Sequence, residues 1–392
     1  MKTTTLLRPL VALVATLLCI GGAAYGQPRI QKITQHHTAP RQNVRCEVPI
    51  GAAYTSAVVR VNGLEVASQV DSLPEVGRVV AFEYDATEGR NRIVIRCGKG
   101  EQKEYPSRVW AQMYYKNKDK SLRKIDYVEE GADTMYNRLH HHGPAFENSE
   151  VAYRLYFDKK QTVDIYGKRH RGLEIAQTMW YPTEEHLAEG SGDDVLRVSG
   201  TVGVGTLKGW DPKKGKATHI DKFERRWARV LSDGPVRTVV EMSVEGWNYG
   251  GERLGLRSIY VLWGSSRECE VRHTLSGPYE GKLFCTGVQK KFGDRTPYIT
   301  DKALAVWAED FPQNDTVRYK KERVGLVVWP ASGRADGYPR VEDKDNYLCL
   351  VSPDSEGHIT YTFAFVWLRE EWEQWTEENF HRYVDGFGAA DR

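Results

Sequence analysis

The segment LHHHGPAFENSEVAYRLYFDKKQTVDIYGKR, residues 139–169, contains two short runs in which apolar and polar residues alternate. A period of two is typical of β-strands, because successive side chains point to opposite faces of a sheet. The apolar set consists of Val151, Tyr153, Leu155, Phe157, Val163 and Ile165. The opposite set consists of Arg154, Tyr156, Asp164, Tyr166 and Lys168. If the apolar set faces a core, the polar set forms one surface of cations and tyrosines, which suits an anionic sugar.

The same strand pattern continues along most of the chain. Short runs between residues 42 and 98, with a hairpin signal at Asn62-Gly63, predict a small N-terminal β-sandwich. After residue 140, strands follow one another without helical spacers, which favours antiparallel sheets. Near the C-terminus, four aromatic residues fall roughly on one face of a predicted helix: Trp372, Trp375, Phe380 and Tyr383. The predicted fold is therefore all-β, with a small sandwich, a large antiparallel sandwich and a C-terminal helix.

These patterns give four predicted segments. Residues 1–26 are a signal peptide, 27–105 the N-terminal β-sandwich, 106–138 a charged and partly helical linker, and 139–392 the catalytic or binding domain. In the first segment, Lys2 and Arg8 precede an apolar run that ends in small residues before Gln27. We expect cleavage after Gly26 and a periplasmic or secreted protein. Lipidation at Cys19 is the less favoured alternative, and no later segment approaches the ~20 apolar residues of a membrane span.

The charge balance excludes some partners. The chain has 55 basic and 53 acidic residues, and the counts become equal once Lys2 and Arg8 are removed. The sequence has no run of basic residues that could bind along a nucleic-acid backbone, so nucleic acid is not an expected partner. Five cysteines remain after residue 26, an odd number that leaves at least one thiol unpaired, although a bridge between Cys46 and Cys97 is possible.

Three consecutive histidines precede the Gly143-Pro144 break. Three adjacent side chains of a strand cannot all reach one metal, but one or two could bind a divalent ion with help from a nearby glutamate. No cofactor is required by the sequence. A histidine with a pKa near ~6.5 is a natural proton-transfer group. The candidate catalytic residues are His141, His142, Tyr156 and Tyr166.

Candidate substrate ligands accompany them. Arg154 and Lys168 would recognise a carboxylate, although a surface ion pair of these side chains with Asp158 or Asp164 is the alternative. The remaining candidate ligands are Glu147, Asn148, Arg169 and Trp247.

A glycine-rich run and a basic loop carry weaker signals. Glycines 200, 203 and 205 lack a following helix to hold a phosphate, so close backbone approach explains them better. The basic loop over residues 211–222 is expected to be solvated.

Three motifs carry a resemblance to a known family. They are FEN at 146–148 ahead of Tyr153-Arg154, DIYGK at 164–168 and GPVR at 234–237. The chain resembles, from about residue 42 to its C-terminus, the Bacteroidetes polysaccharide-utilisation proteins grouped as domain of unknown function 4861. The resemblance implies an exported protein with a mutarotase-like supersandwich. It also implies a dehydratase activity on terminal uronic acids, as proposed within that family.

The residue inventory suits such chemistry. A β-elimination at a uronate needs a base for the C5 proton, an acid for the leaving oxygen and a cation beside the carboxylate. We therefore expect an oligosaccharide partner, with either water or an aglycone as the leaving group. One rival is a glycoside hydrolase that pairs Glu147 or Glu150 with Asp193 or Asp194. The other rival is a sugar-binding protein without catalysis.

Overall fold

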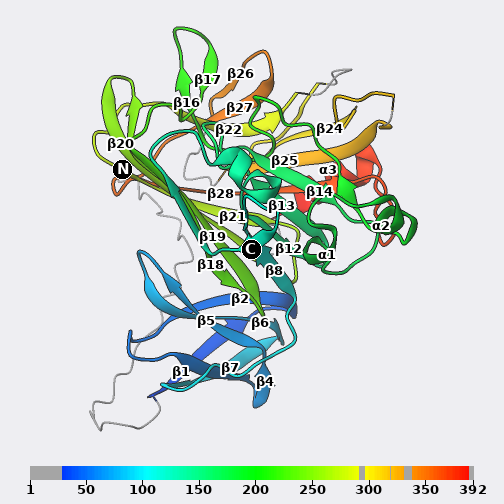
Figure 1. The fold of residues 1–392 in the computed structure, drawn as a ribbon. Coiled ribbons are helices and arrows are strands. Elements are labelled where there is room, and N and C mark those ends of the chain that lie inside the picture. The colour runs from blue at the N-terminus through cyan, green and yellow to red at the C-terminus, as the bar shows by residue number, and fades with distance from the viewer. Residues whose placement is uncertain (1–28, 291–295, 318, 331–337, 388–392) are drawn as a thin grey trace, which may run out of the picture. The chain divides into compact units, whose positions relative to one another are not determined.

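The computed structural model describes residues 29–290, 296–317, 319–330 and 338–387. The predicted signal peptide lies outside the described residues. The described chain forms two compact units, residues 29–70 with 74–103 and residues 71–73 with 104–387. All pairings between the named strands of these segments are antiparallel, and the helices are few and short (Figure 1). The predicted all-β class is confirmed.

The smaller unit is a β-sandwich. One sheet contains, in spatial order, β1 (Arg29–His37), β7 (Gly89–Gly98), β3 (Ser56–Val61) and β4 (Leu64–Val66). The other contains β2 (Arg41–Pro49), β6 (Gly77–Ala86) and β5 (Ser68–Leu73). Asn62 and Gly63, both with positive φ, connect β3 and β4 as predicted. Cys46 and Cys97 lie in the core as free thiols, so the bridge considered possible between them is not formed.

The larger unit is built on a nine-stranded sheet. Its strands, in spatial order, are β11 (Tyr127–Glu130), β18 (Arg225–Asp233), β19 (Arg237–Tyr249), β20 (Glu252–Trp263), β21 (Cys269–Ser276), β28 (His358–Trp367), β25 (Glu322–Pro330), β24 (Leu304–Asp310) and β23 (Tyr298–Ile299). The alternating residues of these strands bury one face in the main core of the unit.

Two five-stranded sheets pack on that core. The first is called the histidine sheet because the three histidines come shortly before its strand β12. It contains β15 (Asp193–Asp194), β14 (Val163–Gly167), β13 (Val151–Leu155), β12 (Ala145–Asn148) and β8 (Val109–Gln112). The second, called the lysine sheet, contains β17 (Lys216–Thr218), β16 (Lys208–Asp211), β22 (Phe284–Gln289), β27 (Asn346–Val351) and β26 (Arg340–Glu342) (Figure 1). Tyr153 of the first, Phe284 of the second and Val271 of the large sheet meet in one core.

The segment predicted as a partly helical linker forms mainly strands, and its helical part is limited to the three residues of η1 (Tyr136–Arg138). Val109–Gln112 pairs with β12 of the histidine sheet, and Tyr127–Glu130 pairs with β18 of the nine-stranded sheet. Between them, β9 (Tyr114–Lys116) and β10 (Leu122–Lys124) form a separate hairpin. The high charge of this segment indicated helix, but main-chain pairing with two existing sheets decides its structure.

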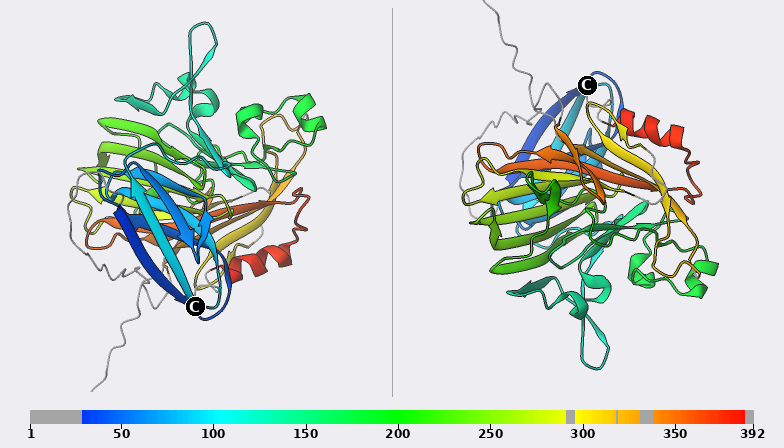
Figure 2. Two further views of the ribbon diagram at one scale, coloured as in Figure 1. Left: turned by 90° about the horizontal axis from the view of Figure 1, so that it is seen from below. Right: turned by 90° about the horizontal axis from the view of Figure 1, so that it is seen from above.

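Short helices complete the larger unit. They are η1 (Tyr136–Arg138), η2 (His140–His142), α1 (Ile175–Thr178), α2 (Glu184–Ala188) and α3 (Glu377–Gly386). The predicted C-terminal helix is α3, which packs against β24 and β25 (Figure 2). Phe380 of α3 is fully buried beside Trp307 and Gly325.

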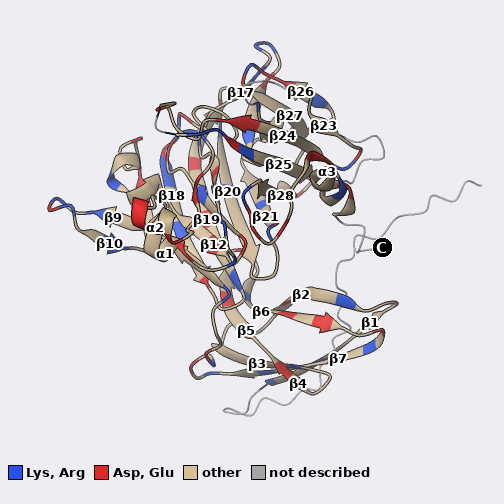
Figure 3. Ribbon diagram, turned by 90° about the vertical axis from the view of Figure 1, so that its right-hand side faces the viewer, with Lys and Arg blue, Asp and Glu red and all other residues tan. Residues whose placement is uncertain are grey.

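Charges are mixed along the described chain, with Lys and Arg interspersed among Asp and Glu (Figure 3). This agrees with the near-equal counts in the sequence. None of the helices within the described ranges has the length and apolar character needed to cross a membrane.

Replacing Phe380 with Ala should lower the free energy of unfolding by about 3–5 kcal/mol, because it leaves a cavity between α3 and the sheet. Arg382 lies on the exposed side of the same helix, and Arg382→Ala should cost less than about 1 kcal/mol. Chemical denaturation of both variants measures the difference. Equal losses would show that α3 is not docked as described.

Candidate functional site

The polar face of the histidine sheet is covered by the chain that follows β14. Residues Ala152 and Tyr166 of this face pack with Ile175 of α1 and with Trp180 in a small second core. Tyr166 and Lys168 have no solvent exposure. The expectation that these two side chains face an open sugar-binding surface is therefore wrong, because α1 and Trp180 occupy that space.

Lys168 and Glu147 form a buried ion pair. The Lys168 ammonium also donates to the carbonyl oxygens of Asn148 (2.7 Å) and Gly172 (2.6 Å). The Glu147 carboxylate accepts from the main-chain N–H groups of Glu174 and Ile175, both at 3.0 Å, where α1 begins. The pair thus ties α1 to β12, a structural role for both residues.

Asn148 is also fully buried. Its side-chain amide donates to the carbonyl oxygens of Trp263 (2.8 Å) and Ser266 (2.6 Å), and its Oδ1 accepts from the N–H groups of Glu150 (2.8 Å) and Val151 (3.0 Å). These contacts join β12 to the end of β20 and leave no group of Asn148 for a sugar.

Arg154 is the centre of a buried charge network. Its Nη2 pairs with Asp164 and, at 3.2 Å, with Asp194, and it donates to the Tyr156 hydroxyl at 2.7 Å. Its Nη1 donates to the Tyr181 hydroxyl at 2.8 Å. Burial, and then the charge of Asp164, raises the pKa of Asp194. The ion pair of Arg154 with Asp164 was one of the open alternatives, and a guanidinium engaged in this way is closed to a substrate carboxylate.

The three histidines have different environments. His141 is buried, and its Nε2 faces the Gln112 side-chain amide at 3.2 Å. Burial lowers the pKa of His141 well below its usual value. His140 is half-buried, with its Nε2 at 3.0 Å from the Met179 carbonyl oxygen. Only His142 is both half-buried and stacked on tyrosine rings.

His142 is fixed at the end of β13 by main-chain hydrogen bonds. Its carbonyl oxygen accepts from the Phe157 N–H at 2.8 Å, and the next residue, Gly143, lies so close to Leu155 that a Cβ there would meet the Leu155 carbonyl oxygen at 1.9 Å. Both His141 and His142 have positive φ, 41° and 67°. Such backbone is uncommon outside glycine and clusters at functional sites.

The His142 ring takes part in an aromatic group. It stacks on Tyr136 with ring centroids 4.1 Å apart, and both rings lie about 6 Å from Tyr156, at 6.1 Å and 5.8 Å. The Lys160 ammonium lies 5.2 Å from the Tyr156 centroid and 5.8 Å from that of Tyr136. We call His142, Tyr136, Tyr156 and Lys160 the ring cluster.

The protonation of His142 follows from its contacts. Its Nδ1 lies 3.1 Å from the Tyr136 carbonyl oxygen, which can only accept, so Nδ1 carries the proton and Nε2 keeps a lone pair. Burial lowers the pKa of His142, which keeps the ring neutral at neutral pH. Burial also raises the pKa of Tyr136 to about 12 and raises that of Tyr156 further, so both phenols stay protonated.

The two other predicted ligands lie apart from the ring cluster in the sequence. Trp247 is buried in the main core and stacks on Tyr249 at 4.7 Å. Arg169 is half-buried at the end of the β14 segment, and its carbonyl oxygen accepts from the Glu371 N–H at 2.9 Å. Neither contact indicates that Trp247 or Arg169 binds a sugar.

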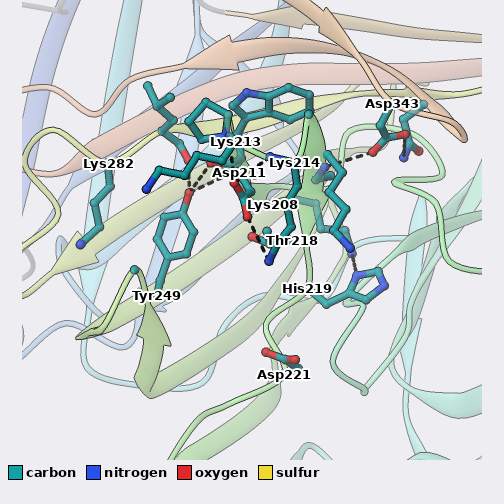
Figure 4. Close-up of a pocket in the computed structure, with 18 of the residues that line it drawn as sticks. Lys208, Asp211, Lys213, Lys214, Thr218, His219, Asp221, Tyr249, Lys282 and Asp343 are labelled. Atoms are coloured by element: carbon teal, nitrogen blue, oxygen red, sulfur yellow. Dashed lines mark hydrogen bonds and ion pairs between the residues drawn. The ribbon is translucent and has the colours of Figure 1, made fainter.

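A large cavity lies on the lysine sheet, with a volume of about 1130 Å³. Seven lysines and four aspartates line it, so its walls are net positive (Figure 4). The basic loop over residues 211–222, expected to be simply solvated, forms part of its wall, and the half-buried Tyr249, backed by the buried Trp247, contributes aromatic surface. Five of its seven lysines lie within residues 208–222, and only Lys282 and Lys344 come from distant segments. The basic loop was therefore a signal in the sequence, but a run of lysines alone does not show that it borders a cavity.

No group of three or more His, Cys, Asp or Glu side chains that could hold a metal ion occurs within the described ranges. A divalent ion at the histidines stays a prediction.

A family model described as domain of unknown function (DUF4861) matches residues 34–390. The chain belongs to the DUF4861 family. This confirms the resemblance seen in the FEN, DIYGK and GPVR motifs. A search of curated proteins found no match.

Two solved structures from Enterococcus faecalis resemble this DUF4861 chain weakly. One is described as a protein in the glycosyl hydrolase family 38, with a TM-score of 0.43, 9% identity, and coverage of 94% of this chain and 45% of that chain. The other, from strain V583, is described as an alpha-mannosidase, with a TM-score of 0.37, 8% identity, and coverage of 94% and 44%. This chain spans less than half the length of either protein.

Lys168→Met should lower the free energy of unfolding by about 3–5 kcal/mol, because it leaves the Glu147 carboxylate buried without its partner. Lys159 is exposed on the β13–β14 connection, and Lys159→Met should change stability by no more than about 0.5 kcal/mol. Adding Glu147→Gln to Lys168→Met should recover part of the loss. Urea denaturation distinguishes these cases. A loss at Lys168 no larger than that at Lys159 would reopen Lys168 as a substrate ligand.

Proposed function

We propose that this protein is an exported carbohydrate-active enzyme that performs β-elimination at a terminal uronate of an oligosaccharide. The observation that carries the proposal is the ring cluster, where a neutral imidazole, two protonated phenols and an ammonium group meet beside a buried charge network. These are the base, the acids and the cation that such an elimination needs. Export rests on the predicted signal peptide.

Each residue of the ring cluster has a distinct role in the proposed reaction. The lone pair on His142 Nε2 removes the C5 proton of the uronate, and the electrons of the broken C–H bond form the C4=C5 double bond. The C4–O bond breaks, and the departing oxygen takes a proton from Tyr136, or from Tyr156 once its hydroxyl gives up the hydrogen bond that it donates to Asp164 at 3.0 Å. Water leaves if the oxygen is a free hydroxyl, and a sugar leaves if it is a glycosidic oxygen. No oxidant or reductant is required.

Lys160 is the proposed carboxylate ligand in place of Arg154. Its ammonium lies over the two tyrosine rings, pairs with Asp158 at 3.4 Å and donates to the Ser199 carbonyl oxygen at 3.1 Å. The Lys160 side chain is nevertheless 21% exposed and so can be reached by a substrate, whereas the Arg154 side chain is 2% exposed. Arg154 acts as a positioning residue, because its Nη2 holds the Tyr156 hydroxyl at 2.7 Å. Tyr136 and Lys160 were not among the predicted site residues.

The hydrolase alternative has less support. A glycosidase needs two carboxyl groups that flank the same bond, but Glu147 is buried against Lys168 and Asp194 against Arg154. Glu150 pairs with Arg171 at 2.8 Å. A sugar-binding protein without catalysis would need none of the proton-transfer geometry at His142. The products separate the three functions: elimination creates an ultraviolet-absorbing alkene, hydrolysis adds reducing ends without it, and binding does neither.

His142→Ala should lower the elimination rate by about 10²–10⁴-fold with little change in substrate affinity, because it removes the base and leaves Lys160 in place. The matched control is His140→Ala, which removes the neighbouring half-buried histidine that is not stacked on Tyr136 and should keep near-normal turnover. Absorbance of the alkene gives the rate, and thermal unfolding confirms that both variants fold. Turnover of His142→Ala within about twofold of wild type would remove it from the mechanism.

The pH dependence of the elimination rate should also reflect the lowered pKa of His142. The neutral ring is the active form, so activity should persist below pH ~6.5, the ordinary value for histidine, and fall only as the pH drops through the lowered pKa. A profile of kcat/KM against pH measures this limb, and His142→Ala should abolish it. An acidic limb at or above ~6.5 would contradict a neutral His142 base.

A further inference from the structure

Lys208 of β16 is a buried cation without a counterion. Its side chain belongs to a residue that is 1% exposed, and its ammonium donates to the Lys160 carbonyl oxygen and faces His219 Nδ1 at 3.3 Å. Within the described part of the chain, no carboxylate lies at ion-pair distance from it. The charged and titratable groups that act on it from neighbouring elements are Asp158, Lys160, His219, Arg226 and the Cys285 thiol.

Burial of an ammonium group without a counterion is energetically unfavourable. A buried ammonium is normally paired, and one without a carboxylate loses its proton more easily. Burial accordingly lowers the pKa of Lys208 to about 7. Burial and the charge of Lys208 lower the pKa of His219 to about 4, so His219 is neutral at neutral pH and cannot balance the lysine. An anion at this position would supply the missing partner.

Lys208 lines the large cavity on the lysine sheet, where further lysines surround it (Figure 4). Two of the four aspartates there are already occupied. Asp211 accepts from the Lys213 N–H at 3.0 Å and pairs with Lys214 at 3.4 Å. Asp343 accepts from the Ala217 N–H at 3.1 Å and from the Asn346 side chain at 2.9 Å. Lys282 pairs with Glu252 at 2.6 Å. With seven lysines against four aspartates and this glutamate, the cavity keeps an excess of positive charge.

The cavity also has a rigid aromatic side. Tyr249 is half-buried, stacks on Trp247 at 14° to its plane, and fixes its hydroxyl by accepting from the Trp210 N–H at 2.9 Å (Figure 4). An aromatic ring held in place offers an apolar surface for the C–H face of a sugar at low entropic cost. Cations beside such a ring match a sugar that carries negative groups.

We propose that this cavity is a second binding site of the protein, for an anionic oligosaccharide, with Lys208 as the buried partner of a carboxylate or sulfate group. The site lies on a different sheet from the ring cluster and requires no step of the proposed elimination. Binding restores a charged Lys208, so at neutral pH and above it is accompanied by uptake of a proton.

Calorimetry on a His142→Ala background tests the proposal, because blocked turnover cannot contribute heat. Four probes are compared: a galacturonic acid tetrasaccharide, a sulfated galactan tetrasaccharide, a neutral galactan tetrasaccharide and inorganic sulfate. At least one acidic tetrasaccharide should bind at least about tenfold more tightly than the neutral one and than sulfate, and the one that binds better identifies the anionic group. Equal binding of all four probes, or of none, would overturn the proposal.

Lys208→Met removes the charge and keeps much of the side-chain volume. It should weaken binding of the acidic tetrasaccharide by at least about tenfold. The matched control is Lys320→Gln, an exposed lysine of the same unit that does not line the cavity, and it should leave the affinity unchanged. An equal effect of both substitutions would show that only general charge matters.

The pH dependence of binding tests the proposal even if Lys208→Met does not fold. With Lys208 intact, affinity should be constant below about pH 7 and fall by up to about tenfold per pH unit above it, and the heat of binding at about pH 8 should depend on the ionisation enthalpy of the buffer. Constant affinity between about pH 6 and about pH 9 would overturn the proposal. Failure of the elimination assay with this binding intact would refute only the proposed function.

Discussion

The arrangement of the larger unit depends on how charge is compensated on the covered face of the histidine sheet. Arg154, Asp164 and Lys168 point from β13 and β14 away from the main core, yet each is almost fully buried. A charge in this position is tolerated only when it is paired and hydrogen-bonded. Asp164 is the counterion of Arg154 and Glu147 that of Lys168, while Asp194, whose pKa is raised by burial, adds a contact to Arg154 at 3.2 Å. The chain between β14 and β15 must therefore fold back over the sheet, because β15 carries Asp194.

This return of the chain creates the surroundings of the ring cluster. Trp180 and Tyr181 follow α1 and contact the Arg154 guanidinium, at 4.6 Å and 5.7 Å from its carbon to the ring centroids. Arg154 in turn holds the Tyr156 hydroxyl, which places that ring beside His142. A network that neutralises itself internally is a poor ligand for a substrate anion but a rigid support for the groups that touch one.

The sequence predicted the elements of this region better than their exposure. Period-two alternation correctly assigned Tyr153 to the core and Arg154 to the opposite face, because side-chain direction in a strand is a local property. It did not predict that α1 would cover the opposite face, since that depends on Glu147 accepting from main-chain groups 27 and 28 residues later. The sequence therefore predicted that Lys168 binds the substrate, although its ammonium forms a structural ion pair.

A close contact between two backbone segments was easier to predict than the arrangement of the site residues. Gly203, interpreted from its neighbours as a point of backbone contact, has φ of +55°, and a Cβ there would lie 2.0 Å from the Val163 carbonyl oxygen. Only glycine tolerates such a position. Tyr136 and Lys208 contact residues that no local pattern connects to them, and burial is the largest cause of their shifted pKa values.

The connection between β13 and β14 brings the two sites of the larger unit into one physical system. Lys160 lies in this connection: its ammonium is over the rings of Tyr136 and Tyr156, and its carbonyl oxygen accepts from Lys208. Asp158, two residues earlier, raises the pKa of both His142 and Lys208, opposing the effect of burial. A change of charge at either site is therefore felt at the other through this connection, residues 156–162.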